Sequence, residues 1–178
     1  MFYQYYTMKK TGDVTMPDML VKLYDMPKID MEEQMAGEGV LIKRAMALDK
    51  VRVMEFVDSQ FNEYCAGWVS ECERAIFNDP PSCYIAVKDG QIIGFACYDA
   101  TALGYFGPTG VLPSEQGKGI GKALLVRCLE SMKEKGYGYA IIGYVVDAVS
   151  FYEKALGAVV IEGSSPEKSV YSNLIDDC

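Results

Sequence analysis

The chain has 178 residues, a length that suits one domain whose core needs no metal or disulfide support. Half of the residues are apolar and 24% are charged, which is an ordinary globular composition. The formal net charge is −8, so the surface would repel phosphate backbones and binding to nucleic acid is not expected. The same charge mildly favours cationic substrates such as amines.

The sequence has no histidine, which removes the commonest general base, the commonest metal ligand and the Ser–His and Cys–His pairs together. Catalysis would have to use carboxylates, tyrosine, cysteine, lysine or water. The six cysteines form no C-x-x-C pair, so no metal site is expected, and their irregular spacing predicts reduced thiols. They lie at positions 65, 72, 83, 97, 128 and 178.

The chain contains no run of about 18 apolar residues that could span a membrane. Its first residues are polar and aromatic, unlike a secretory signal. We therefore predict a cytoplasmic protein with no membrane partner.

Residues 1–36 are rich in methionine and tyrosine and have no clear period. We interpret them as an arm that packs on the domain or on a partner subunit, which leaves a homodimer open. A short strand is expected over 19–24, before Pro27. The domain itself is placed at 37–178, and the apolar run 40–44 predicts its first strand.

Two helices are predicted next. Apolar residues within 51–61 recur at helical spacing, and Asp49 can cap this helix. A second helical pattern covers 68–77, and Pro80 and Pro81 end it.

The period then changes to that of strands. Residues 83–87 and 92–98 predict a β-hairpin, because the Asp-Gly pair between them is a strong turn signal. Residues 103–112 continue as a third strand. Its glycines and proline indicate a bulge or a close approach of another group to the backbone.

The last third of the chain alternates helices and strands. We predict an amphipathic helix over 120–135, a buried strand over 139–146 and a short helix over 148–156. Two strands, 158–161 and 169–175, close the chain. The order from residue 39 onward is then β-α-α-β-β-β-α-β-α-β-β.

The glycine-rich turn before the long helix predicts an anion site. The first N–H groups of a helix have no internal partner, and its macrodipole places positive potential there. Gly117, Gly119 and Gly121 let these amides approach a ligand closely. Residues 116–135 carry five basic and two acidic side chains, a net charge of +3. The alternative is a helix entry that uses glycine only for a tight turn.

Two common phosphate-binding patterns do not fit this turn. The dinucleotide pattern G-x-G-x-x-G fails in both registers, because its last position falls on Lys122 or Leu124. The P-loop pattern fails as well, because its first position falls on Gln116 and Ala123 follows the lysine. The turn therefore belongs to another class of anion site.

The stretch from Val111 to Leu125, VLPSEQGKGIGKALL, resembles the cofactor motif of the GNAT superfamily of acyl-CoA-dependent N-acyltransferases. That motif is written [RQ]-x-x-G-x-[GA], and Gln116, Gly119 and Gly121 match it. The resemblance implies an α/β (α+β) fold with a mixed, mostly antiparallel sheet of about six to seven strands flanked by four helices. It also implies a V-shaped splay between the fourth and fifth strands, where the thioester would lie.

The resemblance also implies a set of cofactor-binding residues. The backbone around Val111 and Leu112 would hold the pantetheine arm of acetyl-CoA. The amides from Gly117 to Lys122 would hold the pyrophosphate. The full set is Val111, Leu112, Gln116, Gly117, Lys118, Gly119, Ile120, Gly121, Lys122 and Phe151.

The segment Phe151-Tyr-Glu-Lys154 resembles the family's Y-E-K segment, which makes Tyr152 the candidate general acid for the departing thiolate. The alternative is a tyrosine that only packs. The sequence departs from the family pattern in two ways. Gly157 follows the tyrosine by five residues rather than four and precedes Ala158 instead of an aromatic residue, and Val145 stands where asparagine is common.

No general base is evident. Asp99, Glu71 and Glu73 are interpreted as solvated surface groups, and a chain of water molecules could deprotonate an amine instead. Trp68, Glu71 and Tyr98 are predicted as walls of the acceptor pocket.

The sequence thus predicts an N-acetyltransferase that moves an acetyl group from acetyl-CoA to a primary amine by direct attack. The acceptor, a small molecule or a peptide, is not identified, and a longer acyl group stays open. The alternative is a non-catalytic acyl-CoA-binding module of the same fold.

Overall fold

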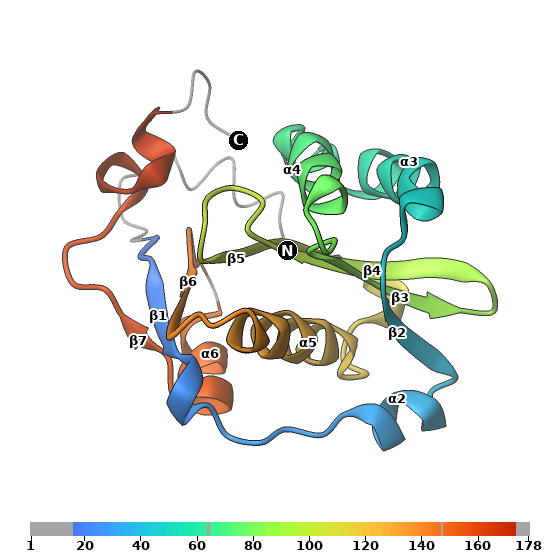
Figure 1. Cartoon of the computed structure of the whole chain (residues 1–178), viewed down its shortest axis with the longest axis horizontal. Helices are drawn as coiled ribbons and strands as arrows, with labels where there is room; N and C mark the ends of the chain where they lie inside the picture. Colours follow the sequence, from blue (N-terminus) through green and yellow to red (C-terminus); the bar gives the residue numbers. More distant parts are fainter. Residues whose placement is uncertain (1–15, 64, 147, 174–178) are drawn as a thin grey trace.

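The computed structural model describes residues 16–63, 65–146 and 148–173. Seven strands form one sheet in the order β2-β3-β4-β5-β6-β1-β7 (Figure 1). Only β5 and β6 are parallel neighbours, so the mixed, mostly antiparallel sheet is confirmed. The strands are β1 Met19–Lys22, β2 Val40–Arg44, β3 Cys83–Lys88, β4 Gln91–Tyr98, β5 Tyr105–Val111, β6 Tyr139–Ile142 and β7 Val159–Val160.

The described part of the chain contains five α-helices, which are α2 Glu32–Gly37, α3 Lys50–Phe61, α4 Gly67–Phe77, α5 Ile120–Glu134 and α6 Val149–Leu156. Helices α3 and α4 cover one face of the sheet, and α5 and α6 cover the other (Figure 1). Four helices were expected, and the additional one is the short α2 between β1 and β2. Among the described helices, none is both long and apolar enough to cross a lipid bilayer.

Each face of the sheet has its own apolar core. On one face, Leu124 and Leu129 of α5 are fully buried against the strands. On the other, Val53 and Val57 of α3 pack with Phe95 of β4. Burying one such side chain contributes about 1.5–3 kcal/mol. Because both faces are covered, the sequences of the central strands are continuous apolar runs.

The predicted hairpin between β3 and β4 is confirmed. Asp89 (φ +50°) and Gly90 (φ +73°) both have positive φ at the turn. A two-residue turn of this kind matches the right-handed twist of the flanking strands, which is why Asp-Gly predicts it well.

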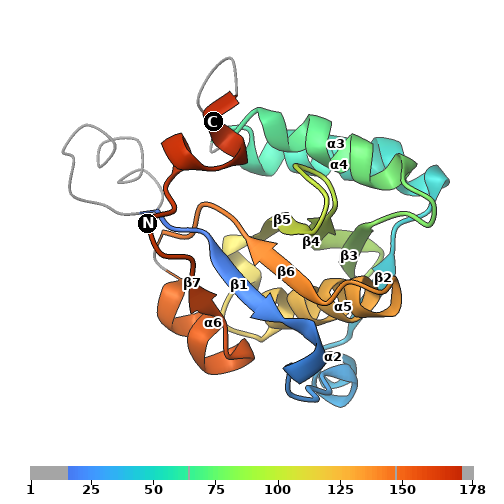
Figure 2. The ribbon, with the colours of Figure 1, turned by 60° about the vertical axis from the view of Figure 1, so that its left-hand side comes forward.

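Strand β1 lies inside the sheet, between β6 and β7 (Figure 2). The short strand expected over 19–24 is therefore present but shorter, because a 3-10 turn begins at Leu23. The side chains of Met19 and Val21 are fully buried. Residues 1–15 lie outside the described residues, and the division of the chain at residue 36 stays a prediction.

Two predicted strands were wrong in extent or type. The strand expected over 139–146 ends at Ile142, because Tyr144 has a positive φ of 58° that an extended strand does not accommodate. In place of a strand from residue 169, a 3-10 turn spans Val170–Asn173, and residues 174–175 lie outside the described part. Since β1 already fills the space between β6 and β7, a C-terminal strand finds no edge there.

Candidate active site

The sheet opens between β5 and β6. The two strands pair at only two positions, Tyr105 with Ile141 and Phe106 with Ile142. Beyond these pairs β5 stays bonded to β4 as far as Val111, whereas β6 has ended. Among the residues that the structure describes, the rest of β5 therefore has a free edge toward β6, and the V-shaped splay is confirmed.

The glycine-rich turn lies where β5 ends and α5 begins. Gly117 (φ +81°) and Gly119 (φ +84°) adopt left-handed backbone angles that favour glycine. The first hydrogen bond of α5 runs from the N–H of Ala123 to the carbonyl of Gly119. Within the described ranges, none of the six N–H groups of residues 117–122 meets an acceptor. These amides at the positive end of a 15-residue helix are suited to an anion.

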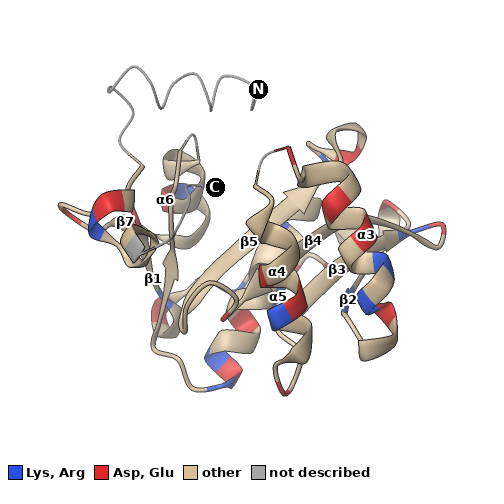
Figure 3. Ribbon diagram, turned by 90° about the horizontal axis from the view of Figure 1, so that it is seen from above, with Lys and Arg blue, Asp and Glu red and all other residues tan. Residues whose placement is uncertain are grey.

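Three lysines lie around the turn, and two of them are paired with a carboxylate in the described part of the chain. The ammonium of Lys118 lies 2.9 Å from Glu115, and that of Lys88 lies 3.9 Å from the same carboxylate. The hydrogen bond from Lys118 holds the pKa of Glu115 below its usual value. Lys122 has no ion-pair partner in the described part of the chain, so its charge is free for a ligand. Acidic residues are spread over several elements rather than gathered in one stripe (Figure 3).

A side-chain hydrogen bond from Gln116 connects the turn to the end of β5. Its Nε2 donates to the carbonyl of Val111 over 3.1 Å, and that oxygen keeps a second lone pair. The N–H of Leu112 already donates to the carbonyl of Ile93 over 2.9 Å. Of the two residues expected to hold the pantetheine arm, Val111 therefore has a free acceptor site while the N–H of Leu112 is engaged. The side chain of Ile120 is buried and anchors the first turn of α5 in the core.

Helix α2 packs directly against the glycine turn, a contact that the sequence did not reveal. The side-chain Nε2 of Gln34 donates to the carbonyl of Lys118 over 3.1 Å. A Cβ placed on Gly119 would lie 2.6 Å from this Nε2 and 3.2 Å from the terminal methyl of Met31. Gly119 is thus required both by its φ and by the helix that covers it.

Tyr152 lies on α6 and is partly buried. Burial raises the pKa of its phenol to about 12, so the hydroxyl stays protonated at neutral pH. Within the described residues this hydroxyl has no hydrogen-bond partner, and it is not sealed from solvent. The neighbouring Phe151 is 43% exposed, with its ring 5.2 Å from that of Tyr152. Both side chains are therefore open to a ligand.

The shifted glycine after Tyr152 has a simple explanation in the structure. Helix α6 runs through Leu156, and Gly157 (φ +63°) is its left-handed C-cap. Val145 is buried, and its N–H donates to the carbonyl of Pro17 over 3.0 Å.

The three residues expected to wall the acceptor pocket do not all meet. Trp68 and Glu71 lie one turn apart on α4, and the indole ring of Trp68 packs 6.0 Å from that of Phe95. Tyr98 is fully buried in the core on the α5 side, where its hydroxyl accepts a hydrogen bond from Arg44 over 3.3 Å. Trp68 and Glu71 therefore share one face of the sheet, and Tyr98 faces the other.

The interpretation of the acidic residues as solvated was wrong for two of them. Asp99 follows β4, has a positive φ of 53° and is only 2% exposed. Its carboxylate accepts hydrogen bonds from the N–H of Gly104 at 2.8 Å, the ammonium of Lys135 at 3.2 Å and the hydroxyl of Tyr137 at 3.1 Å. Glu71 is partly buried.

Glu73, the third acidic residue in that interpretation, does lie in solvent. It is exposed and pairs with Lys50 over 2.6 Å.

The cysteines are not all free thiols. Cys65 is disulfide-bonded, which corrects the prediction for this residue, since pairing depends on proximity in space rather than on spacing. The cysteines at 72, 83, 97 and 128 are free and buried. Burial raises the pKa of the thiols of Cys97 and Cys128 well above the usual value, so they are poor nucleophiles. No cluster of side chains that could hold a metal ion occurs among the described residues.

Comparisons with known proteins match this geometry. The profile of the acetyltransferase (GNAT) family matches residues 51–158, which include β5, the glycine turn and α6. No curated protein matches the chain. A fungal GCN5-related glucosamine N-acetyltransferase region of a GH3 β-N-acetylglucosaminidase has a TM-score of 0.68 and 16% identity, covering 89% of this chain and 22% of that one.

A GCN5-related N-acetyltransferase from Sphaerobacter thermophilus has a TM-score of 0.60 and 21% identity, covering 90% of this chain and 54% of its own. A GNAT family acetyltransferase from Brucella melitensis, solved with acetyl-CoA, has a TM-score of 0.44 and 22% identity over 55% of this chain and 70% of its own. The chain spans less than two thirds of the fungal and Sphaerobacter proteins, and identities this low show a shared fold. The family profile, however, covers more than half of the chain, and the protein is therefore a member of the GNAT acetyltransferase family.

Proposed function

We propose that the protein is an N-acetyltransferase that moves the acetyl group of acetyl-CoA to a primary amine of a small molecule or peptide. One observation carries this proposal, the run of six unpaired amides at residues 117–122 beside the free edge of β5. A diphosphate takes several N–H donors and positive potential, and an extended amide chain can pair with a strand edge. CoA carries a diphosphate followed by an amide chain. The site has the unpaired amides for the first and the free edge of β5 for the second, side by side.

Each part of the cofactor has residues suited to it. The amides of residues 117–122 would hold the diphosphate, and the free ammonium of Lys122 would neutralise part of its charge. The second lone pair of the Val111 carbonyl and the edge of β5 would hold the pantetheine arm. The exposed ring of Phe151 supplies an apolar surface next to Tyr152.

Tyr152 would act as the general acid. The amine nitrogen bonds to the thioester carbon, and the carbon–sulfur bond breaks as the phenol of Tyr152 gives its proton to the departing sulfur. A pKa of about 12 keeps this proton on the phenol at neutral pH, so Tyr152 is available as a donor when negative charge develops on the sulfur. The nitrogen loses one proton as the amide forms, and Tyr152 regains one from solvent, so no net proton is taken up.

The decisive test is Gly121→Glu. A Cβ at Gly121 meets only a methyl of Val111 at 3.7 Å, and its φ is helical, so the fold tolerates the change. An acidic residue in the first turn of a helix is stabilising, so the melting temperature should not fall. The added carboxylate would lie among the anion-binding amides. We expect the affinity for acetyl-CoA, measured by calorimetry, to fall by about 10-fold or more.

Gly138→Glu is the matched control, because it adds the same side chain in open space at the far end of α5. Its affinity for acetyl-CoA should equal that of the wild type. Normal binding by Gly121→Glu would show that the turn is not the diphosphate site. Binding of acetyl-CoA by the wild type without transfer to any amine would identify a non-catalytic acyl-CoA-binding module instead.

A further inference from the structure

A line of polar side chains crosses the opening of the sheet on the face away from α5. It comes from three separate segments, which are α4, the loop between β4 and β5, and the C-terminal 3-10 turn Val170–Asn173. Figure 1 shows this loop rising between α4 and the C-terminal turns. The line consists of Glu71, Thr101 and Tyr171.

Thr101 links the other two members. Its hydroxyl Oγ1 donates to Oε1 of Glu71, and its interaction with the Tyr171 phenol lowers the pKa of that phenol, against the larger effect of burial, which raises it. Threonine has one hydroxyl proton, and here it points at Glu71. With that proton committed to Glu71, the oxygen of Thr101 is available as an acceptor for the proton of Tyr171.

Tyr171 places its hydroxyl where β5 and β6 separate. A Cβ on Gly143, the first residue after β6, would lie 2.5 Å from this oxygen. The ring of Tyr171 also packs edge-on against Tyr105, at 6.4 Å, and Tyr144, at 5.5 Å. The phenol thus lies at the apex of the opening, where the thioester would meet its acceptor.

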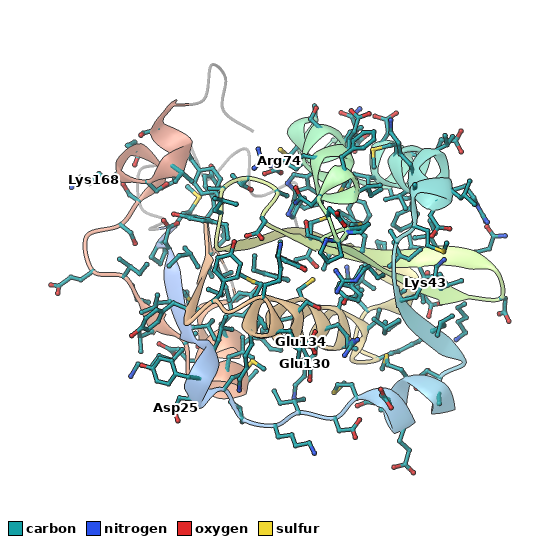
Figure 4. The ribbon with its side chains drawn as sticks, viewed as in Figure 1. Asp25, Lys43, Arg74, Glu130, Glu134 and Lys168 are labelled. Carbon is teal, nitrogen blue, oxygen red and sulfur yellow. The ribbon has the colours of Figure 1, made fainter. Side chains whose placement is uncertain are left out.

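The surroundings leave Glu71 without a cation. No described residue forms an ion pair with it. Arg74, one turn further along α4, instead donates its Nε to the carbonyl of Asp99 over 3.2 Å, on the side of α4 that faces the C-terminal turns (Figure 4). The other titratable groups nearby are the Cys72 thiol and the Asp18 and Tyr105 side chains around Tyr171.

Burial raises the pKa of Glu71, against the opposing effect of the Thr101 hydrogen bond. A carboxylate with a raised pKa is a stronger base near neutral pH.

We propose that Glu71 is the terminal proton acceptor of the transfer reaction and that Tyr171 and Thr101 relay the proton to it. This inference rests on the proposed acetyl transfer. As the neutral amine bonds to the thioester carbon, its nitrogen gives one proton to the oxygen of Tyr171. Tyr171 passes its own proton to Thr101, and Thr101 passes its proton to Glu71, which becomes neutral. Glu71 then releases a proton to solvent as Tyr152 regains one.

The other acidic groups are less suited to this role. Asp99 is already paired with Lys135 and also accepts hydrogen bonds from Gly104 and Tyr137. Asp18 accepts the N–H of Tyr144 over 3.1 Å, which fixes it at the end of β6. Glu73 is paired with Lys50 in solvent. Glu71 alone, among these four, is a partly buried carboxylate that ends a chain of hydroxyl groups.

The test compares Glu71→Gln with Glu73→Gln, a matched change on the same helix. Thiol release from saturating acetyl-CoA is followed against pH with benzylamine, glucosamine and spermidine as acceptors. Hydrolysis of acetyl-CoA, in which water must lose a proton by the same route, is the readout if no amine reacts. Glu71→Gln should lower kcat by about 10²-fold and abolish the acid limb of the profile, whereas Glu73→Gln should match the wild type.

The relay itself is tested at Thr101. Thr101→Val keeps the shape and removes the hydroxyl, so kcat should fall as far as in Glu71→Gln, and the double variant should fall no further. Thr101→Ser restores the hydroxyl and should restore kcat. Equal losses in Thr101→Val and Thr101→Ser, or an intact acid limb in Glu71→Gln, would overturn the relay. Acetyl-CoA should bind all of these variants normally, so failure of the wild type to bind it would instead reject the proposed function.

Discussion

The two halves of the proposed site are built in different ways. The proposed cofactor half is one continuous stretch, from the end of β5 through the glycine turn into α5, and backbone groups make most of it. The proposed acceptor half would join side chains of Glu71, Thr101 and Tyr171 from three distant segments. A site of the first kind tolerates change outside its own stretch, whereas the second depends on how the whole domain packs. Variants of the cofactor half should therefore change the affinity for acetyl-CoA, whereas variants of the acceptor half should change kcat or the kcat/KM for the amine.

Tyr152→Phe should have the largest effect. It removes one hydroxyl and keeps the ring, so kcat should fall by about 10²-fold while the affinity for acetyl-CoA stays the same. Because burial raises the pKa of Tyr152 to about 12, wild-type kcat should not decline near pH 10, the usual tyrosine value. Stopped assays with the best acceptor, together with calorimetry, measure both quantities. An unchanged kcat would mean that another donor protonates the sulfur.

Asp99→Asn should loosen the acceptor half without touching the turn. The buried carboxylate holds the loop that carries Thr101, through the N–H of Gly104 and the ammonium of Lys135. Losing the charge leaves Lys135 without its partner and should cost about 1–3 kcal/mol of unfolding free energy, measured in urea. The kcat/KM for the amine should fall while acetyl-CoA affinity does not. A fall in acetyl-CoA affinity instead would contradict the separation of the two halves.

Gln34→Ala tests the cofactor half from outside, because Gln34 contacts the glycine turn from a helix that is distant in the sequence. Its amide holds the carbonyl of Lys118, and a neutral hydrogen bond contributes about 0.5–1.5 kcal/mol. The affinity for acetyl-CoA should fall about 2- to 10-fold as the turn becomes less ordered. Glu33→Ala changes an exposed neighbour on the same helix and serves as the control. Equal affinities for both variants would show that the turn holds its shape without α2.

The smallest effect concerns the stability of Glu71→Gln. Burial raises the pKa of Glu71 in the folded state, so protonated Glu71 adds to the unfolding free energy at pH values below its unfolded-state pKa of about 4.3. This contribution is lost as the pH rises through the folded-state pKa. At neutral pH the ionised Glu71 therefore costs stability. Replacing it with the neutral amide should leave the melting temperature at pH 7 unchanged or slightly higher. A marked decrease would indicate that Glu71 serves packing rather than proton transfer.

For the acidic residues, the sequence failed as a guide because the missing information was a contact between distant segments. The interpretation of Glu71 and Asp99 as solvated could not foresee that Thr101 and Lys135 meet them, 30 and 36 positions away. The C-terminal strand was predicted from its apolar residues alone. In the structure β6 pairs with β1 over four positions, and Val170–Asn173 forms a 3-10 turn outside the sheet.

The sequence by itself determined the cofactor half, because positive-φ glycines, a strand end and a helix start are consecutive and act through their own backbone. It also determined the hairpin at Asp89-Gly90, whose turn is equally local. Only the tertiary structure decided that β1 enters the sheet, that Gln34 covers a turn 84 residues away, and that Tyr171 reaches the apex beside Gly143. These depend on which surfaces the folded core brings together, and no short stretch of sequence encodes that.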